Sequence, residues 1–295
     1  MRNIRLFLLS VVAALLVSCG TTSTVPITGR KQNLLVSDEQ VLSLSNQQYR
    51  EYMQSAKRST DAANTEMVKR VGQRLASAVV SYLNNNGLGS EVSQYQWEFN
   101  LVQDKQVNAF CMPGGKIVVY EGLLPVTRDE ASLAIVLGHE IAHAVAKHSA
   151  ERLSNAYKQQ YGVNILSAVA AGAGVSSGVQ QLGQVALGLG SKAFTAGFSR
   201  SQESEADHMG LIFAAMAGYD SQVAVAFWQR MSSATGGGSS SIFSDHPTDN
   251  TRIRHIREWM PEAKKYYKPS VTVTAASKST GRRRTVERTI HIKSK

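Results

Sequence analysis

Two histidines four residues apart, with a glutamate directly after the first, stand in the stretch LGHEIAHAVAKH at residues 137–148. On an α-helix each residue advances by about 100°, so His139 and His143 lie one turn apart on one face. Two imidazoles in that arrangement can share a metal ion, and the H-E-x-x-H spacing is typical of zinc-dependent hydrolases. The surrounding residues are mostly apolar, so the helix is predicted to be buried. Burying three polar side chains without partners costs on the order of several kcal/mol, and a metal removes that objection.

A catalytic zinc needs a third protein ligand and one position open to water. The longer pattern H-E-x-x-H-x-x-G-x-x-H is excluded, because its glycine and its last histidine are absent from the sequence. Glu203, within SRSQESEADHMG, is the candidate third ligand, and Asp207 lies one helical turn further along. Asp207 can orient a ligand histidine through the free ring N–H of that histidine. The sequence therefore predicts one Zn²⁺ per chain, bound by His139, His143 and Glu203.

Glu140 lies too close in sequence to bind the same ion alongside both histidines. It is instead placed to take a proton from water and later to hand it to a leaving amine. Zinc in such a site lowers the pKa of water toward about 7 and polarises a carbonyl group. These residues together predict a metal-dependent peptide-bond hydrolase.

Other polar residues near these motifs are expected to stay outside the site. His148 would lie about 180° from His139 on a continuous helix, where it would interact with the helix C-terminus. On the second helix, Glu205 points away from the face that carries Glu203, and His208 also lies on another side. None of the three is predicted to contribute to metal binding.

The N-terminus is predicted to be a secretory signal peptide. An apolar run over residues 6–17 follows two arginines and is too short to span a bilayer. The following LVSCG resembles a bacterial lipoprotein processing site, in which cleavage precedes Cys19 and that cysteine is acylated. An ordinary signal peptide with a chance cysteine is the alternative. Acylation would anchor the protein to a membrane and leave Cys111 as the one remaining thiol, so that no internal disulfide can form.

Gly20, directly after the cysteine, resembles the outer-membrane sorting pattern of Gram-negative lipoproteins. The expected localisation is therefore the outer membrane, facing the periplasm, if the host is Gram-negative. Residues 159–191 carry no charged side chain and many glycines. They are predicted to form a small-residue helical hairpin or flap, and insertion into the membrane is the alternative.

A chain of 295 residues with 43% hydrophobic residues can form one main domain with appendages. We predict a signal peptide (1–18), a lipidated tether with one extended piece (19–36), a metallopeptidase domain (37–265) and a basic tail or hairpin (266–295). Most of the net charge of +10 falls in the signal peptide and the tail. A nucleic-acid partner is therefore not expected, and the oligomeric state is left open.

Helices and strands follow from capping residues and periodicity. Ser37 and Gln40 form a capping box at the start of the first helix, and Thr127 with Glu130 is expected to form another. The predicted helices cover about 38–57, 61–83, the H-E-x-x-H segment, 199–217 and a segment after 220. The predicted strands cover 95–102, 107–113 and 115–120.

Four stretches, VNAFCMPGGKIVVYEGLL, LGHEIAHAVAKHSAER, SRSQESEADHMGLIFAAMAGYD and HPTDNTRI, occur in this order. Together they resemble the HtpX and CAAX-prenyl-protease-like zinc metallopeptidases, in particular the soluble periplasmic lipoprotein branch (LoiP- and BepA-like), over roughly residues 25–260. The resemblance implies an α+β, mainly helical zincin-type fold with a small β-sheet whose edge strand flanks the active site. It also implies Glu203 as the third metal ligand.

The resemblance implies further roles near the metal. An extended substrate would add to an edge strand over residues 115–119, with contacts to Gly115, Lys116, Ile117 and Val118. Asn108 would hydrogen-bond substrate or the oxyanion, unless it only caps its own turn. His246 and Arg252 resemble a loop over the metal, where His246 would either donate to the oxyanion or fill the open metal position and keep the enzyme latent.

The resulting hypothesis is a zinc metalloendopeptidase of the bacterial cell envelope that cleaves unfolded or misfolded proteins in protein quality control. Its expected partners are unfolded or partly folded envelope proteins and, through Cys19, the membrane. A chaperone-like or assembly lipoprotein, which binds envelope proteins through the same edge strand with little proteolysis, is the main alternative. A lipid-modifying metalloenzyme is a third, favoured only by the uncharged 159–191 stretch.

Overall fold

The computed structural model describes residues 21–156, 158–159, 197–234 and 250–267. The predicted signal peptide, Cys19, His246, residues 268–295 of the basic tail and all but the first residue of the uncharged 159–191 stretch lie outside this part of the chain. Within the described residues, none of the helices combines the length and the apolar composition that a membrane crossing requires. The predicted domain boundaries remain predictions.

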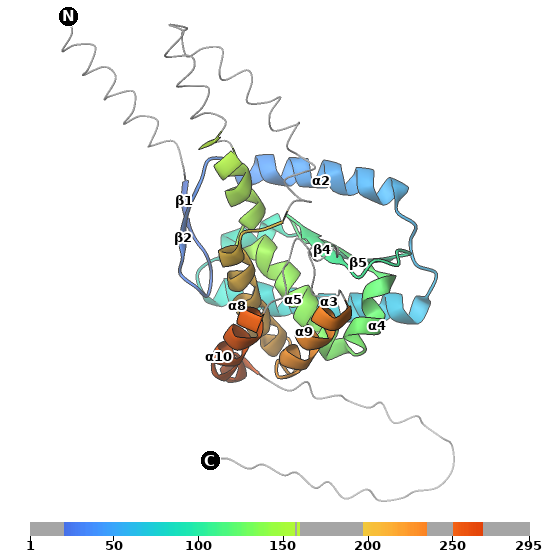
Figure 1. Ribbon diagram of the computed structural model, residues 1–295. Coiled ribbons are helices and arrows are strands. Elements are labelled where there is room, and N and C mark those ends of the chain that lie inside the picture. The colour runs from blue at the N-terminus through green and yellow to red at the C-terminus, as the bar shows by residue number, and fades with distance from the viewer. Residues whose placement is uncertain (1–20, 157, 160–196, 235–249, 268–295) are drawn as a thin grey trace, which may run out of the picture.

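Helix α5 (Glu130–Val145) runs through the centre of the domain (Figure 1). It packs on one side against α8 (Arg200–Met216) and α9 (Val223–Ala234). On the other side it contacts α3 (Ala62–Asn85) and strand β4 (Ala109–Met112). Every residue of α5 from 132 to 143 is buried, which agrees with the predicted buried helix.

The remaining elements enclose this centre. Helix α10 (Asn250–Tyr266) packs across α8, and α2 (Asp38–Ser55) lies at the opposite end of the domain (Figure 1). Helix α10 was not among the predicted elements, because its sequence is strongly polar and contains a proline. The short elements are α4 (Leu124–Thr127) and two 3₁₀ turns, Gly89–Gln94 and Glu121–Leu123.

The main sheet has three strands in the order β3-β5-β4, with β3 (Glu98–Val102) parallel and β4 antiparallel to β5 (Lys116–Tyr120). The predicted edge strand over residues 115–119 is therefore wrong, since β5 is the central strand. All five residues of β5 are buried, as its continuous apolar run indicates for a strand covered on both faces. The edge strand that contacts α5 is β4, whose two middle residues are half-buried.

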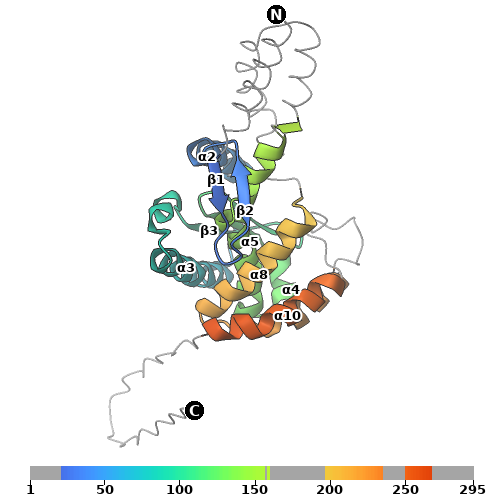
Figure 2. The ribbon, with the colours of Figure 1, turned by 90° about the vertical axis from the view of Figure 1, so that its left-hand side faces the viewer.

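Residues 21–34 form a β-hairpin, whereas the sequence predicted a tether with one extended piece. Strand β1 (Thr21–Thr24) pairs antiparallel with β2 (Lys31–Leu34), and the hairpin lies between α2 and α8 (Figure 2). The turn between the strands needs left-handed backbone at Gly29, with φ of 68°. Gln32 and Leu34 are buried, whereas Lys31 and Asn33 are exposed. This alternation of buried and exposed residues covers only four positions, which is too short to predict from the sequence that the strand packs against the domain.

Two predicted helix starts differ in outcome. Ser37 forms the predicted capping box with Gln40 at the start of α2. The predicted box of Thr127 with Glu130 is wrong, because Thr127 ends α4 and Asp129 caps α5 by accepting the Ser132 N–H. Arg128, in a left-handed conformation with φ of 69°, ends α4 and separates the two helices.

A pair of glycines sets the distance between α5 and α8. A Cβ atom added at Gly138 would lie 2.7 Å from the carbonyl oxygen of Gly210. One added at Gly210 would lie 2.7 Å from the backbone nitrogen of His139. Both obstacles are backbone atoms, which cannot rotate away. The two helices can therefore approach this closely only while both positions are glycine.

We expect Gly210→Ala to lower the free energy of unfolding by about 1–3 kcal/mol, the usual cost of overpacking a well-packed contact. Because α5 and α8 carry the predicted metal ligands, the variant should also bind zinc more weakly. Urea unfolding and zinc titration measure the two effects. Ser204→Ala, at a half-buried position on the same helix, is the control and should change stability by less than about 0.5 kcal/mol. Equal stability of Gly210→Ala and the wild type would contradict the assigned contact.

Candidate metal centre

Three buried side chains converge where α5 and α8 face each other. The Nε2 atoms of His139 and His143 lie 3.0 Å apart. Oxygens of Glu203 lie 3.5 Å from Nε2 of His139 and 3.4 Å from Nε2 of His143. All three candidate ligand atoms lie within 4.8 Å of one another, and each residue is at most 5% exposed. The structure thus brings together the three predicted ligands from two helices.

Local sequence fixes the position of the carboxylate. Ser199 begins α8 with a capping box, in which its side chain and that of Gln202 satisfy each other's backbone N–H. The N–H of Glu203 then donates to the Ser199 carbonyl at 2.9 Å, in the first turn of the helix. Glu203 is therefore held on rigid backbone, and the helix N-terminus favours its negative charge.

The ring nitrogens of the two histidines fit a shared cation. Nδ1 of His139 lies 2.8 Å from Oδ1 of Asp207, and Nδ1 of His143 lies 2.8 Å from Nδ1 of His148. With the protons of neutral rings on Nδ1, two Nε2 lone pairs face each other and repel, unless a proton or a cation lies between them. Two imidazole nitrogens and one carboxylate oxygen are a common donor set of catalytic zinc.

The pKa values of the two rings differ in the metal-free protein. Burial disfavours the protonated ring of His139, but hydrogen bonds and charge from Asp207 and Glu203 outweigh it and raise its pKa to about 9. Burial lowers the pKa of His143 well below its usual value. Without a metal, His139 is thus the more readily protonated of the two rings, and metal binding at its Nε2 requires loss of that proton.

Asp207 and Arg252 form hydrogen bonds to the metal-ligand residues His139 and Glu203. Arg252 donates from Nε and from one terminal nitrogen to Asp207, and from that same terminal nitrogen to Oε2 of Glu203 at 3.2 Å. Its guanidinium also stacks over Trp228, 3.8 Å from the ring centroid. Burial would raise the pKa of Asp207, but the charges of Arg252 and His139 outweigh it and hold that pKa below its usual value. Arg252 stands in α10, and so the predicted loop placement of this residue is wrong: its buried ion pairs anchor a helix.

Glu140 points from α5 toward the edge strand. The residue is 2% exposed, and its Oε2 accepts the backbone N–H of Cys111 in β4 at 3.3 Å. The predicted proton carrier therefore joins the helix of the metal-ligand histidines to the edge strand β4.

The residues predicted to bind substrate are placed differently. Asn108 accepts the N–H of Ala109 with its own side chain at 2.9 Å, so here it caps its turn, the alternative that its sequence left open. Gly115 precedes the central strand, and Lys116 forms an ion pair with Glu98. Ile117 and Val118 are fully buried in the core. The predicted edge position of residues 115–118 is therefore wrong, since they belong to or precede the central strand, and substrate contacts at these residues stay a prediction.

Sequence reasoning missed two residues that join the site. His148 bonds to His143, and its Nε2 lies 3.0 Å from Oε2 of Glu205. The prediction assumed a continuous helix, but α5 ends at Val145 and Lys147 is left-handed, with φ of 55°. This turn brings His148 back beside the metal-ligand face. The sequence did contain a signal for these two residues. It has a third histidine shortly after H-E-x-x-H and a second glutamate two residues after the ligand Glu203.

Glu205 is strongly acidic in this position. Burial alone would raise its pKa, but hydrogen bonds from His148, Thr28 and Arg30 lower it to about 2. Glu205 is thus an ionised carboxylate under ordinary conditions. His208, by contrast, bonds to Glu262 at 2.7 Å and stacks on Trp259, outside the centre as predicted.

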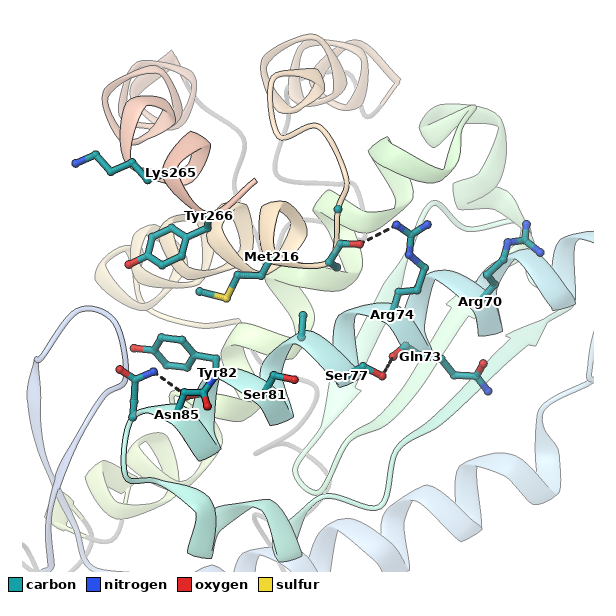
Figure 3. Close-up of a pocket in the computed structure, with 14 residues that line it drawn as sticks. Arg70, Gln73, Arg74, Ser77, Ser81, Tyr82, Asn85, Met216, Lys265 and Tyr266 are labelled. Atoms are coloured by element: carbon teal, nitrogen blue, oxygen red, sulfur yellow. Dashed lines mark hydrogen bonds between the residues drawn. The ribbon is translucent and has the colours of Figure 1, made fainter. Parts of the chain in front are cut away.

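A pocket of about 820 Å³ opens between α3 and the C-terminal ends of α8 and α10 (Figure 3). Arg70, Arg74 and Lys265 contribute its positive charge, and Tyr82 and Tyr266 contribute aromatic surface. Arg70 pairs with Glu130, and Arg74 donates to a backbone carbonyl, so both guanidinium groups have structural partners. None of the predicted site residues lines this pocket, and no role in the chemistry is assigned to it.

Comparisons with known proteins agree with a metal centre formed by these residues. The peptidase family M48 model matches residues 62–260. The mitochondrial metalloendopeptidase OMA1 of Schizosaccharomyces pombe is 39% identical over 176 residues, which cover 59% of this chain and 50% of the relative. Two Escherichia coli proteins also match: metalloprotease LoiP at 32% identity over 226 residues (76% of this chain, 82% of LoiP) and metalloprotease YcaL at 30% over 273 residues (90% and 100%).

The chain spans about half the length of the OMA1 relatives from S. pombe and cattle. It spans most or all of the two bacterial relatives. The family match covers about two thirds of the chain and includes all three candidate metal ligands, Glu140, Asp207 and Arg252. The resemblance inferred from the four motifs is confirmed: the chain belongs to peptidase family M48.

Proposed function

We propose that this protein is a zinc-dependent endopeptidase of the bacterial cell envelope, which cleaves unfolded or misfolded proteins in quality control. The observation that carries the proposal is the convergence of His139, His143 and Glu203, with Glu140 beside them on the same helix. The printed names of the relatives, metalloprotease and metalloendopeptidase, support hydrolysis of peptide bonds.

Each side chain has a task in this proposal. His139, His143 and Glu203 hold the zinc, which when bound supplies Lewis-acid activation of water and of the substrate carbonyl. Glu140 takes the proton from water and returns it to the leaving amine. The edge strand β4, joined to Glu140 through Cys111, is the place for an extended peptide to pair by backbone hydrogen bonds.

The preference for unfolded proteins follows from that pairing. Strand addition requires several consecutive residues in extended conformation with free backbone groups, which a folded protein seldom exposes. The proposed location at the outer membrane, facing the periplasm, rests on the predicted signal peptide and on the predicted acylation of Cys19. A role for His246 as an oxyanion donor or as a latency ligand remains part of the proposal.

The test combines metal analysis with digestion of unfolded casein. Wild type should retain about one zinc per chain and cleave casein, and removal of the zinc by a chelator should stop cleavage until zinc is restored. Glu203→Ala should bind zinc more than about a hundredfold more weakly, because losing a direct ligand costs more than losing an outer-shell partner. Glu66→Ala, at an exposed glutamate of α3, is the control and should match wild type. A wild-type protein that cleaves casein equally with and without metal would contradict the proposal.

A further inference from the structure

We propose that the β1–β2 hairpin is part of the metal centre: Thr28 and Arg30 hold Glu205, which acts through His148 to fix the orientation and proton position of His143. The inference rests on the zinc-dependent activity proposed above. It gives a positioning role to a segment that precedes the M48 match, which begins at residue 62.

An unbroken series of hydrogen bonds joins the hairpin to the ligand. The Thr28 hydroxyl donates to Oε1 of Glu205, and Nε of Arg30 donates to Oε2 of Glu205 at 2.8 Å. The same Oε2 lies 3.0 Å from Nε2 of His148. Nδ1 of His148 lies 2.8 Å from Nδ1 of His143. The two histidines and Glu205 are each at most 8% exposed, so water has little access to the bonds among these three residues.

The chemistry of these groups determines which atom donates and which accepts in each hydrogen bond of the series. An ionised carboxylate only accepts hydrogen bonds, so Nε2 of His148 must carry the ring proton. Nδ1 of a neutral His148 then has a lone pair and accepts the N–H from Nδ1 of His143. This arrangement leaves a lone pair on Nε2 of His143, the atom that faces His139 and Glu203. The opposite tautomer of His143 would place a proton on that atom and could not bind a metal.

The two metal-ligand histidines are thus held in similar ways, each through a carboxylate that an arginine binds. His139 bonds directly to Asp207, and Arg252 holds that carboxylate. His143 reaches Glu205 through His148, and an arginine holds that carboxylate as well. The difference is the origin of the arginine. Arg252 belongs to the family-matched helices, whereas Arg30 comes from the N-terminal hairpin.

Further contacts keep the hairpin in place. Nε2 of Gln32 donates to the carbonyl of Ala146 at 3.0 Å, at the C-terminal end of α5. Arg30 forms a bidentate pair with Glu151, at 2.7 and 3.0 Å. The hairpin therefore contacts both α8 and the segment after α5 (Figure 2). These contacts hold the hairpin beside the segment that carries His148, independently of the bonds from Thr28 and Arg30 to Glu205.

The experiment measures zinc affinity by competition with a chromophoric chelator in the full chain. Arg30→Met removes the guanidinium but keeps an apolar stem, and Glu205→Gln introduces an amide that can donate to His148 and reverse its tautomer. Each should weaken zinc binding about 10- to 100-fold, the usual effect of losing an outer-shell partner. Thr28→Val, which is isosteric and milder, should weaken it in the same direction by less.

A matched control separates positioning from docking. Glu151→Gln removes the other carboxylate partner of Arg30 while Glu205, His148 and His143 keep their bonds. Its zinc affinity should stay within about threefold of wild type. If it falls as far as in Arg30→Met, the effect comes from loose docking of the hairpin and the inference is overturned.

A second readout reports the tautomers themselves. In ¹⁵N NMR of the histidine rings of the zinc-bound protein, Nδ1 of His143 should be protonated and Nδ1 of His148 should not. Glu205→Gln should change the His148 pattern even where the variant is as well folded as wild type by circular dichroism. The reverse assignment in wild type, or wild-type zinc affinity in a folded Glu205→Gln, overturns the inference. If wild type binds no zinc, the proposed function fails instead, and so the two failures are distinct.

Discussion

Replacing Glu140 with glutamine is expected to lower the rate of casein cleavage by about 10²–10⁴-fold, the range that a general acid–base residue contributes. Glutamine has almost the same shape and can still accept the Cys111 N–H that Glu140 accepts at 3.3 Å. It cannot take a proton from water at neutral pH. The fold, the zinc content and the affinity for an unfolded protein should therefore stay close to those of wild type.

Glu130→Gln provides the matched control, because Glu130 lies in the first turn of the same helix and pairs at the surface with Arg70. Its cleavage rate should equal that of wild type. The Glu140 variant also separates the endopeptidase from the chaperone-like alternative. If Glu140→Gln lost cleavage but fully restored the envelope function of a deletion strain, binding rather than proteolysis would be the physiological activity.

Arg252→Met is expected to lower the free energy of unfolding by about 3–5 kcal/mol, since it leaves buried charge without its partner. Arg252 is 5% exposed and donates to both Asp207 and Glu203. Methionine keeps apolar contact with Trp228 but leaves two buried carboxylates facing each other. Urea unfolding of the zinc-free protein measures the loss without a contribution from metal binding.

Arg254→Met is the control for this prediction. Arg254 stands two residues further on the same helix, is exposed, and approaches Glu258 at 3.8 Å. An exposed pair of this kind contributes about 0–1 kcal/mol, so the control should be nearly as stable as wild type. Equal losses in the two variants would show that the buried arginine does not compensate the carboxylates.

The helices that carry chemistry were predictable because their signals are local. The spacing of His139 and His143, and the Ser37 cap of α2, depend on residues within one or two helical turns. The confirmed α+β, mainly helical fold follows from those signals together with three β-like stretches. The Glu203 position also followed from spacing, once a third ligand was required.

Other features depend on contacts between distant residues and could not be predicted. Which of two neighbouring strands forms the edge is decided by the pairing of β5 with β3, across an intervening loop and strand. The helical extrapolation that excluded His148 failed because one left-handed residue, Lys147, redirects the chain. Glu205 gains its role from Thr28 and Arg30, more than 170 residues earlier, and no local pattern contains that information.

The direct contact between Gly138 and Gly210 bears on how this protein can vary in evolution. Where side chains hold two helices apart, each conservative exchange of those side chains changes the separation and shifts whatever the helices carry. Here main chain rests on main chain, one residue before His139 on α5. The surrounding apolar residues are thus free to change while the span between imidazole and carboxylate keeps its length.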